Sequence, residues 1–202
     1  MHEILKNLDN NGRNTWATSV KLLLDKFGFH YVWVSQGVEN ETVFLNIFEQ
    51  RVKEHFKDSW LSNVRNSSKL AIYCTLKEEY TFEPYLEHVV IRKHRVALSK
   101  LRCSNHSLHI EVGRHNGTAL ANRICSFCKQ DNHIVLEDEY HLLLCCPTYN
   151  ALRQTYLQGL YVTTDYNTFV SILSSVEPLV TRSVGAYIYH ALDLRKSLLE
   201  YK

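Results

Sequence analysis

The sequence predicts a mainly α fold, in which a helical domain carries a small irregular zinc-binding knuckle. Apolar residues recur at helical spacing in several segments, most clearly from Glu39 to Val64. The 202 residues include only 7 Gly and 3 Pro, so the turns that a β-sandwich or barrel needs are scarce. Four Cys and His residues in the second half of the chain have the spacing of zinc ligands.

The N-terminal part is expected to form two helices separated by a short extended segment. Trp16 to Phe27 has helical periodicity and stops at Gly28. Phe29 to Val34 lies between two glycines and is expected to be strand-like or extended. Glu39 to Val64 is expected to be one long helix. Its apolar face would carry Phe44, Ile47, Phe48, Val52, Phe56, Trp60 and Leu61.

The second half is expected to be helical on both sides of the cysteine-rich segment. The expected helices are Leu70–Tyr80, Tyr85–Ser104, Asp138–Leu160 with a break at Pro147, and Tyr166–Tyr201 divided near Pro178. Ser107 to Asn122 has weak periodicity and is expected to be irregular. We therefore divide the chain into a helical linker region (1–90), a module with a basic helix and the knuckle (91–160), and C-terminal helices (161–202).

The strongest motif is Cys125-x2-Cys128, followed after twelve residues by His141-x4-Cys146 and a proline. Three thiolates and one imidazole at this spacing are typical of a closed tetrahedral Zn²⁺ site. Such a site has no open position for water, so the predicted role of the metal is structural. The alternatives are that some of these cysteines are core thiols or, less favoured, that two of them form a disulfide.

The choice between Cys145 and Cys146 depends on the following proline. In a regular helix Cys145 lies on the same face as His141, and Cys146 points about 100° further around the axis. Pro147, however, pushes the residue before it out of the α region, so Cys146 stands where the chain can turn back. We select Cys146 as the ligand and expect Cys145 to be a small buried hydrophobe.

The compartment is expected to be intracellular, either nucleus or cytoplasm, with reduced thiols. The polar N-terminal stretch lacks the apolar core of a signal peptide, and no apolar run is long enough to span a membrane. The six cysteines are therefore not expected to form a disulfide framework. Cys74 and Cys103 lie in helical patterns and are expected to be core residues.

Positive charge is clustered locally, although the net charge is only +2. On a helix, Arg92, Arg95 and Arg102 fall within about 80° of one another. Arg114 and Arg123 then precede the cysteine turn. Cationic side chains beside a knuckle can hold phosphates, so RNA or DNA is the expected partner. The alternative is an ordinary solvated helix face.

Three neighbouring residues complete this interpretation. Lys100 falls outside the predicted basic face, and Tyr140 and Tyr149 near the knuckle are candidates for stacking on bases.

The chain is not expected to be an enzyme. It has no Asp-Asp dipeptide of the kind with which a polymerase holds two metal ions, and no recognisable set of nuclease carboxylates. The acidic triplet Glu137–Glu139 is better explained as the first turn of a helix. There the negative carboxylates interact favourably with the positive end of the helix dipole. One of them can accept a hydrogen bond from the second ring nitrogen of His141.

Three stretches follow one another from Arg95 onward: RVALSKLRCSNHSLHIEVGRH, RICSFC and EDEYHLLLCCPTYNALR. In this order they resemble the zinc-binding region after the reverse transcriptase domain of non-LTR (LINE-type) retrotransposons. VKLLLDKFGFHYVWVSQGV and TFVSILSSVEPLVTRSVGAYIYHALDLRK are similar to neighbouring parts of such elements, so the resemblance covers most of the chain. Family members usually have a shorter gap between the second Cys and the His, which leaves open whether His133 is a ligand.

The resemblance implies a fragment of a longer polyprotein, an accessory module beside a reverse transcriptase core that contacts template RNA or target DNA. A competing hypothesis is a zinc-stabilised helical domain that binds protein and has no affinity for nucleic acid.

Overall fold

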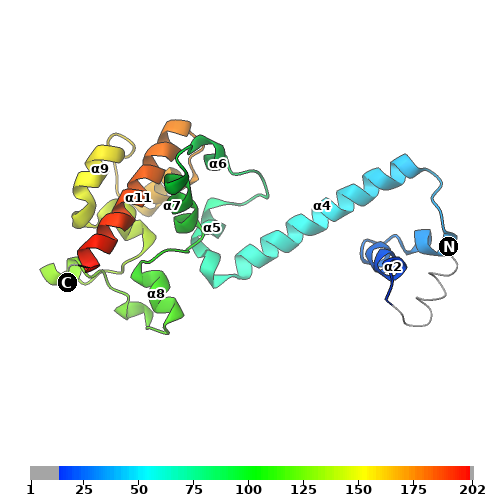
Figure 1. The fold of residues 1–202 in the computed structure, drawn as a ribbon, viewed down its shortest axis with the longest axis horizontal. Coiled ribbons are helices and arrows are strands. Elements are labelled where there is room, and N and C mark those ends of the chain that lie inside the picture. The colour runs from blue at the N-terminus through cyan, green and yellow to red at the C-terminus, as the bar shows by residue number, and fades with distance from the viewer. Residues whose placement is uncertain (1–13, 201–202) are drawn as a thin grey trace. The chain divides into compact units, whose positions relative to one another are not determined.

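The computed structural model describes residues 14–200, and the chain divides into two compact units between Trp60 and Leu61. The mainly α prediction is confirmed. Helices dominate the described residues (Figure 1). Within these residues the β pairing consists of a single antiparallel bridge between Ile124 and Leu136. None of the helices within residues 14–200 combines the length and the apolar character needed to cross a membrane.

The first unit contains α2 (Trp16–Lys26), α3 (His30–Ser35) and most of α4 (Glu41–Asn66). A capping box formed by Thr15 and Thr18 starts α2, because each side chain bonds the backbone N–H of the other residue. The chain leaves α2 at Gly28, whose φ of 76° lies in the left-handed region that glycine adopts without strain.

The prediction that Phe29 to Val34 is strand-like was wrong, because this segment forms α3. Phe29 and Trp33, one helical turn apart, are 3% and 8% exposed and pack into the small core of the unit. A strand would place Tyr31 on the same face as these two residues, yet Tyr31 is 56% exposed. A short apolar run does not distinguish the two structures, and packing against α2 and α4 selects the helix.

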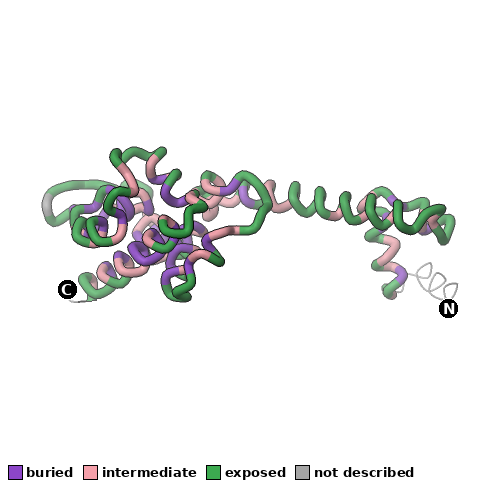
Figure 2. The backbone as a smooth tube through the Cα atoms, turned by 90° about the horizontal axis from the view of Figure 1, so that it is seen from above, coloured by how far each residue is buried: buried purple, intermediate pink, exposed green. Residues whose placement is uncertain are grey.

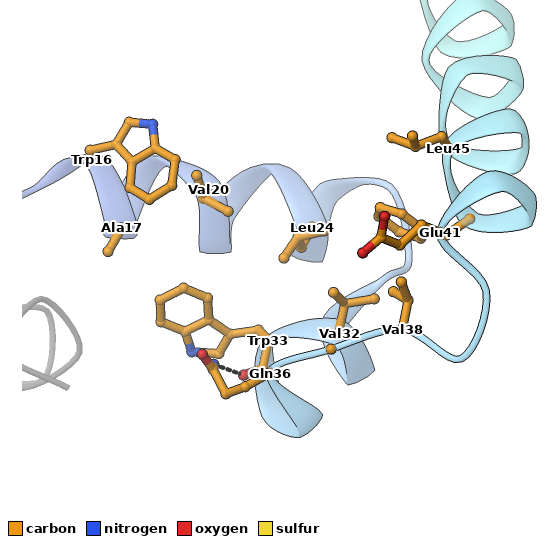
Figure 3. Close-up of a pocket in the computed structure, with 12 residues that line it drawn as sticks. Trp16, Ala17, Val20, Leu24, Val32, Trp33, Gln36, Val38, Glu41 and Leu45 are labelled. Carbon is orange, nitrogen blue, oxygen red and sulfur yellow. Dashed lines mark hydrogen bonds between the residues drawn. The ribbon is translucent and has the colours of Figure 1, made fainter. Parts of the chain in front are cut away.

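An apolar recess opens between the three helices of the first unit (Figure 3). Trp16, Leu24 and Trp33 line it from α2 and α3, and Leu45 and the carboxylate of Glu41 lie at its α4 side. The side chains of Trp16 and Leu45 remain 71% and 59% exposed. This unit therefore keeps large apolar side chains exposed around the recess.

The long helix expected from Glu39 to Val64 is confirmed as α4. Its N-terminal half packs against the small core, where Phe44 and Phe48 lie 5.3 and 5.5 Å from the ring of Phe29. Further along the helix most residues are exposed (Figure 2). Of the predicted apolar face, Val52, Trp60 and Leu61 are half-buried there and Phe56 is 51% exposed.

Replacing Phe29 with alanine should destabilise the first unit by about 3 kcal/mol, the low end for such a truncation, because the open recess lets neighbours relax. All three tryptophans of the chain, Trp16, Trp33 and Trp60, belong to this unit, so selectively excited tryptophan fluorescence during urea unfolding follows it. Tyr31→Ala is the matched control and should cost less than about 0.5 kcal/mol. A larger cost for Tyr31→Ala than for Phe29→Ala would restore the strand assignment.

The second unit places the basic helix, the knuckle and the C-terminal helices around one hydrophobic core. Here α11 (Pro178–Glu200) packs along α7 (Arg92–Arg102) and α9 (Asn150–Tyr156). The expected boundaries near residues 90 and 160 both fall inside this unit. The two C-terminal helices are as predicted, with α10 at Tyr166–Ser174 and Pro178 as the first residue of α11.

The helix expected over Tyr85–Ser104 is instead two helices, α6 (Tyr85–His88) and α7. The backbone is non-helical at Val89 and extended at Ile91, and the break lets Val89 enter the core at 1% exposed. Arg95 stabilises the break, because its Nη1 donates to the carbonyl oxygens of Leu86 and Val89 at 3.3 and 3.2 Å.

Two other segments also differ from expectation. The helix expected over Leu70–Tyr80 is shorter, with a 3-10 turn at Ser68–Leu70 and α5 at Ala71–Leu76. The stretch expected to be irregular contains α8 (His109–His115) and a 3-10 turn at Leu120–Asn122. A Cβ at Gly113 would lie 2.6 Å from Cγ of Arg123, so this glycine lets the Arg123 side chain pack closely against α8 and does not break the helix.

Candidate metal centre

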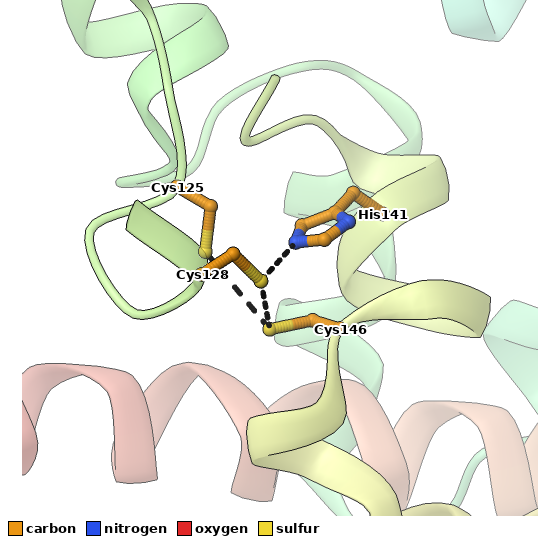
Figure 4. A group of neighbouring side chains, drawn as sticks. All are labelled: Cys125, Cys128, His141 and Cys146. Carbon is orange, nitrogen blue, oxygen red and sulfur yellow. Dashed lines mark hydrogen bonds between the residues drawn. The ribbon is translucent and has the colours of Figure 1, made fainter. Parts of the chain in front are cut away.

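The structure brings together the four predicted ligands, Cys125, Cys128, His141 and Cys146 (Figure 4). Their ligand atoms all lie within 4.8 Å of one another. Sγ of Cys146 is 3.9 Å from Sγ of Cys125 and 3.8 Å from Sγ of Cys128, and Cys128 Sγ is 3.4 Å from Nε2 of His141. All four residues are buried, with Cys146 0% exposed. This group can hold a metal ion.

The first two ligands stand on a tight turn at the end of a short antiparallel pairing. The N–H of Cys125 donates to the carbonyl of Val135 at 2.9 Å, and the N–H of Lys129 returns to the carbonyl of Cys125 at 3.0 Å. Backbone N–H groups of Phe127 and Cys128 also donate to the sulfur of Cys125. The turn therefore directs both sulfurs and nearby amides toward one point, as a thiolate site requires.

The twelve residues between the ligand pairs fold back without adding a ligand. A 3-10 turn at Cys128–Asp131 ends at Asn132, whose φ of 59° reverses the chain. The N–H of His133 donates to the carbonyl of Cys128 at 3.0 Å, while its side chain is exposed and lies outside the ligand group. Whether His133 joins the ligands was left open by the sequence, and the structure places it away from them.

The other two ligands are joined by a π-helical turn at His141–Cys145. The N–H of Cys146 donates to the carbonyl of His141, five residues earlier, at 2.8 Å. This wider turn brings Cys146, five positions after His141, back over that residue, and Pro147 keeps Cys146 extended at the exit. The selection of Cys146 agrees with this geometry. The expectation that Cys145 is buried was wrong: the wider turn leaves it exposed.

Side chains from two other helices donate hydrogen bonds to backbone carbonyl groups of this segment. The sequence did not indicate that either helix contacts the site. The hydroxyl of Tyr187 on α11 donates to the carbonyl of Leu142 at 2.6 Å. Arg153 on α9 donates to the carbonyls of Cys146 and Leu142. Tyr187 and Arg153 are 0% and 6% exposed, so the knuckle is held from inside the core.

The acidic triplet before His141 also has structural partners. Glu137, 2% exposed, accepts two hydrogen bonds from the guanidinium of Arg195, at 2.8 and 2.6 Å. Glu139 accepts from His106 at 2.8 Å, and Asp138 accepts from the backbone N–H of His141 at 2.7 Å. The expected carboxylate contact to His141 is therefore made to its backbone, as in a helix cap.

The hydrogen bond between Cys125 and Cys146 shifts the pKa values of their thiols in opposite directions. The hydrogen bond between Cys125 and Cys146, together with burial, raises the pKa of the Cys125 thiol to about 12. The same hydrogen bond lowers the pKa of Cys146. Three sulfurs and one imidazole nitrogen that converge within 4.8 Å fit a metal ion, which binds thiols in their deprotonated form.

The predicted basic face on α7 is not assembled as expected. Arg102 is 4% exposed, donates to Glu83 at 2.9 Å and lies 4.9 Å from the centroid of the Tyr85 ring. Arg95 is half-buried and bonds the carbonyls at the end of α6. Arg92 alone of the three predicted residues is exposed. The arc of α7 that contains Arg95 and Arg102 faces the protein interior. The prediction that Arg102 contacts phosphates was therefore wrong, because its side chain is buried against Glu83.

The two arginines before the cysteines also have internal acceptors. Arg114 pairs with Glu111 at 2.6 Å. Arg123 donates to the carbonyls of Thr118 and Ile110 at 2.9 and 3.0 Å. Both side chains are half-buried. Their hydrogen bonds stabilise α8 and the loop that follows it, so these arginines do not form an open cationic patch.

The two tyrosines expected to stack on bases are in different environments. Tyr149 is 2% exposed, and burial raises the pKa of its hydroxyl. Its ring is covered, so the expectation that it stacks on a base is withdrawn. Tyr140 is half-buried, and its ring centroid lies 5.8 Å from that of Phe169.

Cys74 and Cys103 were expected to be core residues, but both are half-buried.

No protein-family model matches the chain, and neither the curated proteins nor the solved structures contain a match to it.

Proposed function

We propose that this chain is a zinc-stabilised accessory module without catalysis of its own, a fragment of a non-LTR retrotransposon reverse transcriptase, and that it binds RNA or DNA. The observation that carries the proposal is the buried group of three cysteines and one histidine. Its two ligand pairs come from separate turns, so a bound metal would cross-link the knuckle and fix it to the helical core.

Zinc is the metal that we propose, because three thiolates and one imidazole in a closed set are typical of structural zinc sites. Bonds of about 2.3 Å to sulfur and about 2.0–2.1 Å to nitrogen in a tetrahedron give edges of about 3.8 Å between sulfurs and about 3.6 Å from sulfur to nitrogen. Two of the three sulfur–sulfur separations are 3.8 and 3.9 Å, one sulfur–nitrogen separation is 3.4 Å, and all four ligand atoms lie within 4.8 Å of one another. A disulfide would require sulfurs about 2.05 Å apart. Reduced, metal-binding thiols are consistent with an intracellular location.

A structural role follows from the number of ligands. Four protein ligands fill a tetrahedral site and leave no position where water or substrate would be activated. The carboxylates nearest the ligands are occupied as well: Glu137 pairs with Arg195, Glu139 with His106, and Asp138 caps the backbone at His141. The proposed module therefore binds and positions partners.

A second candidate function is a protein-interaction domain with no affinity for nucleic acid. Two observations favour it. Arg102, Arg114 and Arg123 are turned toward internal acceptors. The first unit also exposes large apolar side chains around its recess, including Trp16 and Leu45.

Metal analysis and a salt titration separate these candidates. Protein purified without chelator should contain a single zinc ion per chain, measured by elemental mass spectrometry. Its affinity for a labelled single strand should fall steeply as salt increases, because bound phosphates displace counterions. Zinc without salt-dependent binding would favour the protein-interaction domain, and protein without zinc would remove the basis of both.

A further inference from the structure

A groove between α7 and α11 has an excess of positive charge. Arg92, Lys93 and Lys100 line it from α7, and Lys196 lines it from α11. Asp193 is the carboxylate in its lining. All four cations belong to exposed residues. Lys196 also has an ion pair with Glu200, at 3.7 Å, but both side chains are largely exposed and such a pair is weak.

Helical geometry explains why these cations face the groove while Arg95 and Arg102 do not. At 100° per residue, positions 92, 93, 96, 97 and 100 lie within an arc of about 140°, and positions 189, 192, 193 and 196 of α11 within about 100°. The two arcs face one another where the helices pack. Arg92 and Lys100 are eight residues apart, about 12 Å along α7, so the charges follow the groove instead of meeting at one point.

The floor of the groove is apolar and aromatic. Val96 and Leu192 line it beside the ring of Tyr189. The ring is held from behind, where its centroid lies 5.3 Å from that of His94 and 5.1 Å from that of His190. Tyr189 is half-buried, and Nζ of Lys93 lies 4.5 Å from its ring centroid, so an ammonium group on a flexible stem covers the ring.

We propose that this groove binds a single strand of nucleic acid, with Arg92, Lys93, Lys100 and Lys196 on successive phosphates and the ring of Tyr189 under a base. The inference rests on the proposed function and assigns it a site. A phosphate that attracts Lys93 would draw its ammonium off the ring and open the ring to the base.

The shape and chemistry of the groove distinguish this ligand from other anions. A duplex presents phosphates outward and keeps its bases stacked, so it would leave the apolar floor uncovered. A small anion would need the cations at one point. An acidic peptide would satisfy the charges but offers no flat ring for Tyr189, whereas every base has a π face.

Binding of a short labelled oligouridine to the zinc-loaded full chain, followed by fluorescence anisotropy across a salt series, tests the groove. Charge reversal of Arg92, Lys100 and Lys196 to Glu should weaken binding roughly tenfold or more and flatten the slope of log affinity against log salt by about 0.7 per lost contact. Tyr189→Ala should weaken binding roughly tenfold, within the range for loss of one stacked base, and Tyr189→Phe should not.

The matched control reverses the same number of exposed cations elsewhere, at Lys53, Lys57 and Arg65 on α4. It should bind like the unaltered protein, and all variants should keep their zinc and helical circular dichroism. Equal loss in the control, or equal competition by polyglutamate, would overturn the groove assignment, as would binding that survives reversal of the groove. If the unaltered protein binds neither oligouridine nor the corresponding DNA, the nucleic-acid part of the proposed function fails along with the groove.

Discussion

Cys146→Ser should release the metal and unfold the knuckle, whereas Cys145→Ser should do neither. The two cysteines are adjacent, yet Cys146 is 0% exposed within the ligand group and Cys145 is exposed outside it. Structural zinc contributes on the order of 10 kcal/mol to folding in small zinc domains. A loss of more than about 5 kcal/mol is therefore expected for Cys146→Ser, which lowers the thermal midpoint by roughly 10–20 °C in a chain of this length.

Zinc content by elemental mass spectrometry and thermal unfolding by circular dichroism provide the two readouts. The adjacent serine variant controls for loss of a thiol in the same segment. Retention of zinc by Cys146→Ser together with its release by Cys145→Ser would show that the other cysteine is the ligand. Because every ligand must lose a proton to bind, the metal-dependent part of the stability should be present at neutral pH and lost as the pH falls.

Arg195→Leu should destabilise the second unit by about 3–5 kcal/mol, because it removes the guanidinium that neutralises the buried carboxylate of Glu137. The side chains of Arg195 and Glu137 are only 5% and 3% exposed, and the pair makes two short hydrogen bonds. Glu137 also accepts from the N–H of His109 at 2.9 Å, so the pair connects α8, the knuckle and α11. Urea unfolding followed by far-ultraviolet circular dichroism measures the change.

Two companion variants identify the cause of this loss. Lys196→Leu alters the next residue on the same helix, whose ion pair with Glu200 is exposed, and should cost less than about 0.5 kcal/mol. Adding Glu137→Gln to Arg195→Leu should restore part of the stability, because an amide is cheaper to bury than a charge and can still accept from His109. Equal losses for Arg195→Leu and Lys196→Leu would mean that the buried charge is not responsible.

The ligand set could be predicted from sequence because it depends on local spacing. Two residues between Cys125 and Cys128 define a turn, and Pro147 fixes the conformation at Cys146. The supports of the site could not be predicted in this way. Tyr187 is 45 positions from Leu142, whose carbonyl it bonds, and nothing local signals that contact.

The basic helix shows a different limit. Its helical periodicity was correct, but a helical wheel carries cations on two arcs and does not say which arc faces the core. Glu83, nineteen positions before Arg102, supplies the buried partner that turns Arg102 inward. Lys93 and Lys100 are left on the exposed arc. The strand expected at Phe29–Val34 failed for a related reason, since tertiary packing decides the structure of a short apolar run.

The loop of twelve residues between Cys128 and His141 should tolerate changes in its length at little cost in stability. The entropy of closing a loop grows only with the logarithm of its length, so doubling the loop would cost about 0.6 kcal/mol. Asn132 to Val135 are exposed, and Ile134 is 77% exposed. Insertions at this exposed segment should therefore leave the geometry of the four ligands unchanged. This holds for insertions that arise in evolution and for a tag that is added by design.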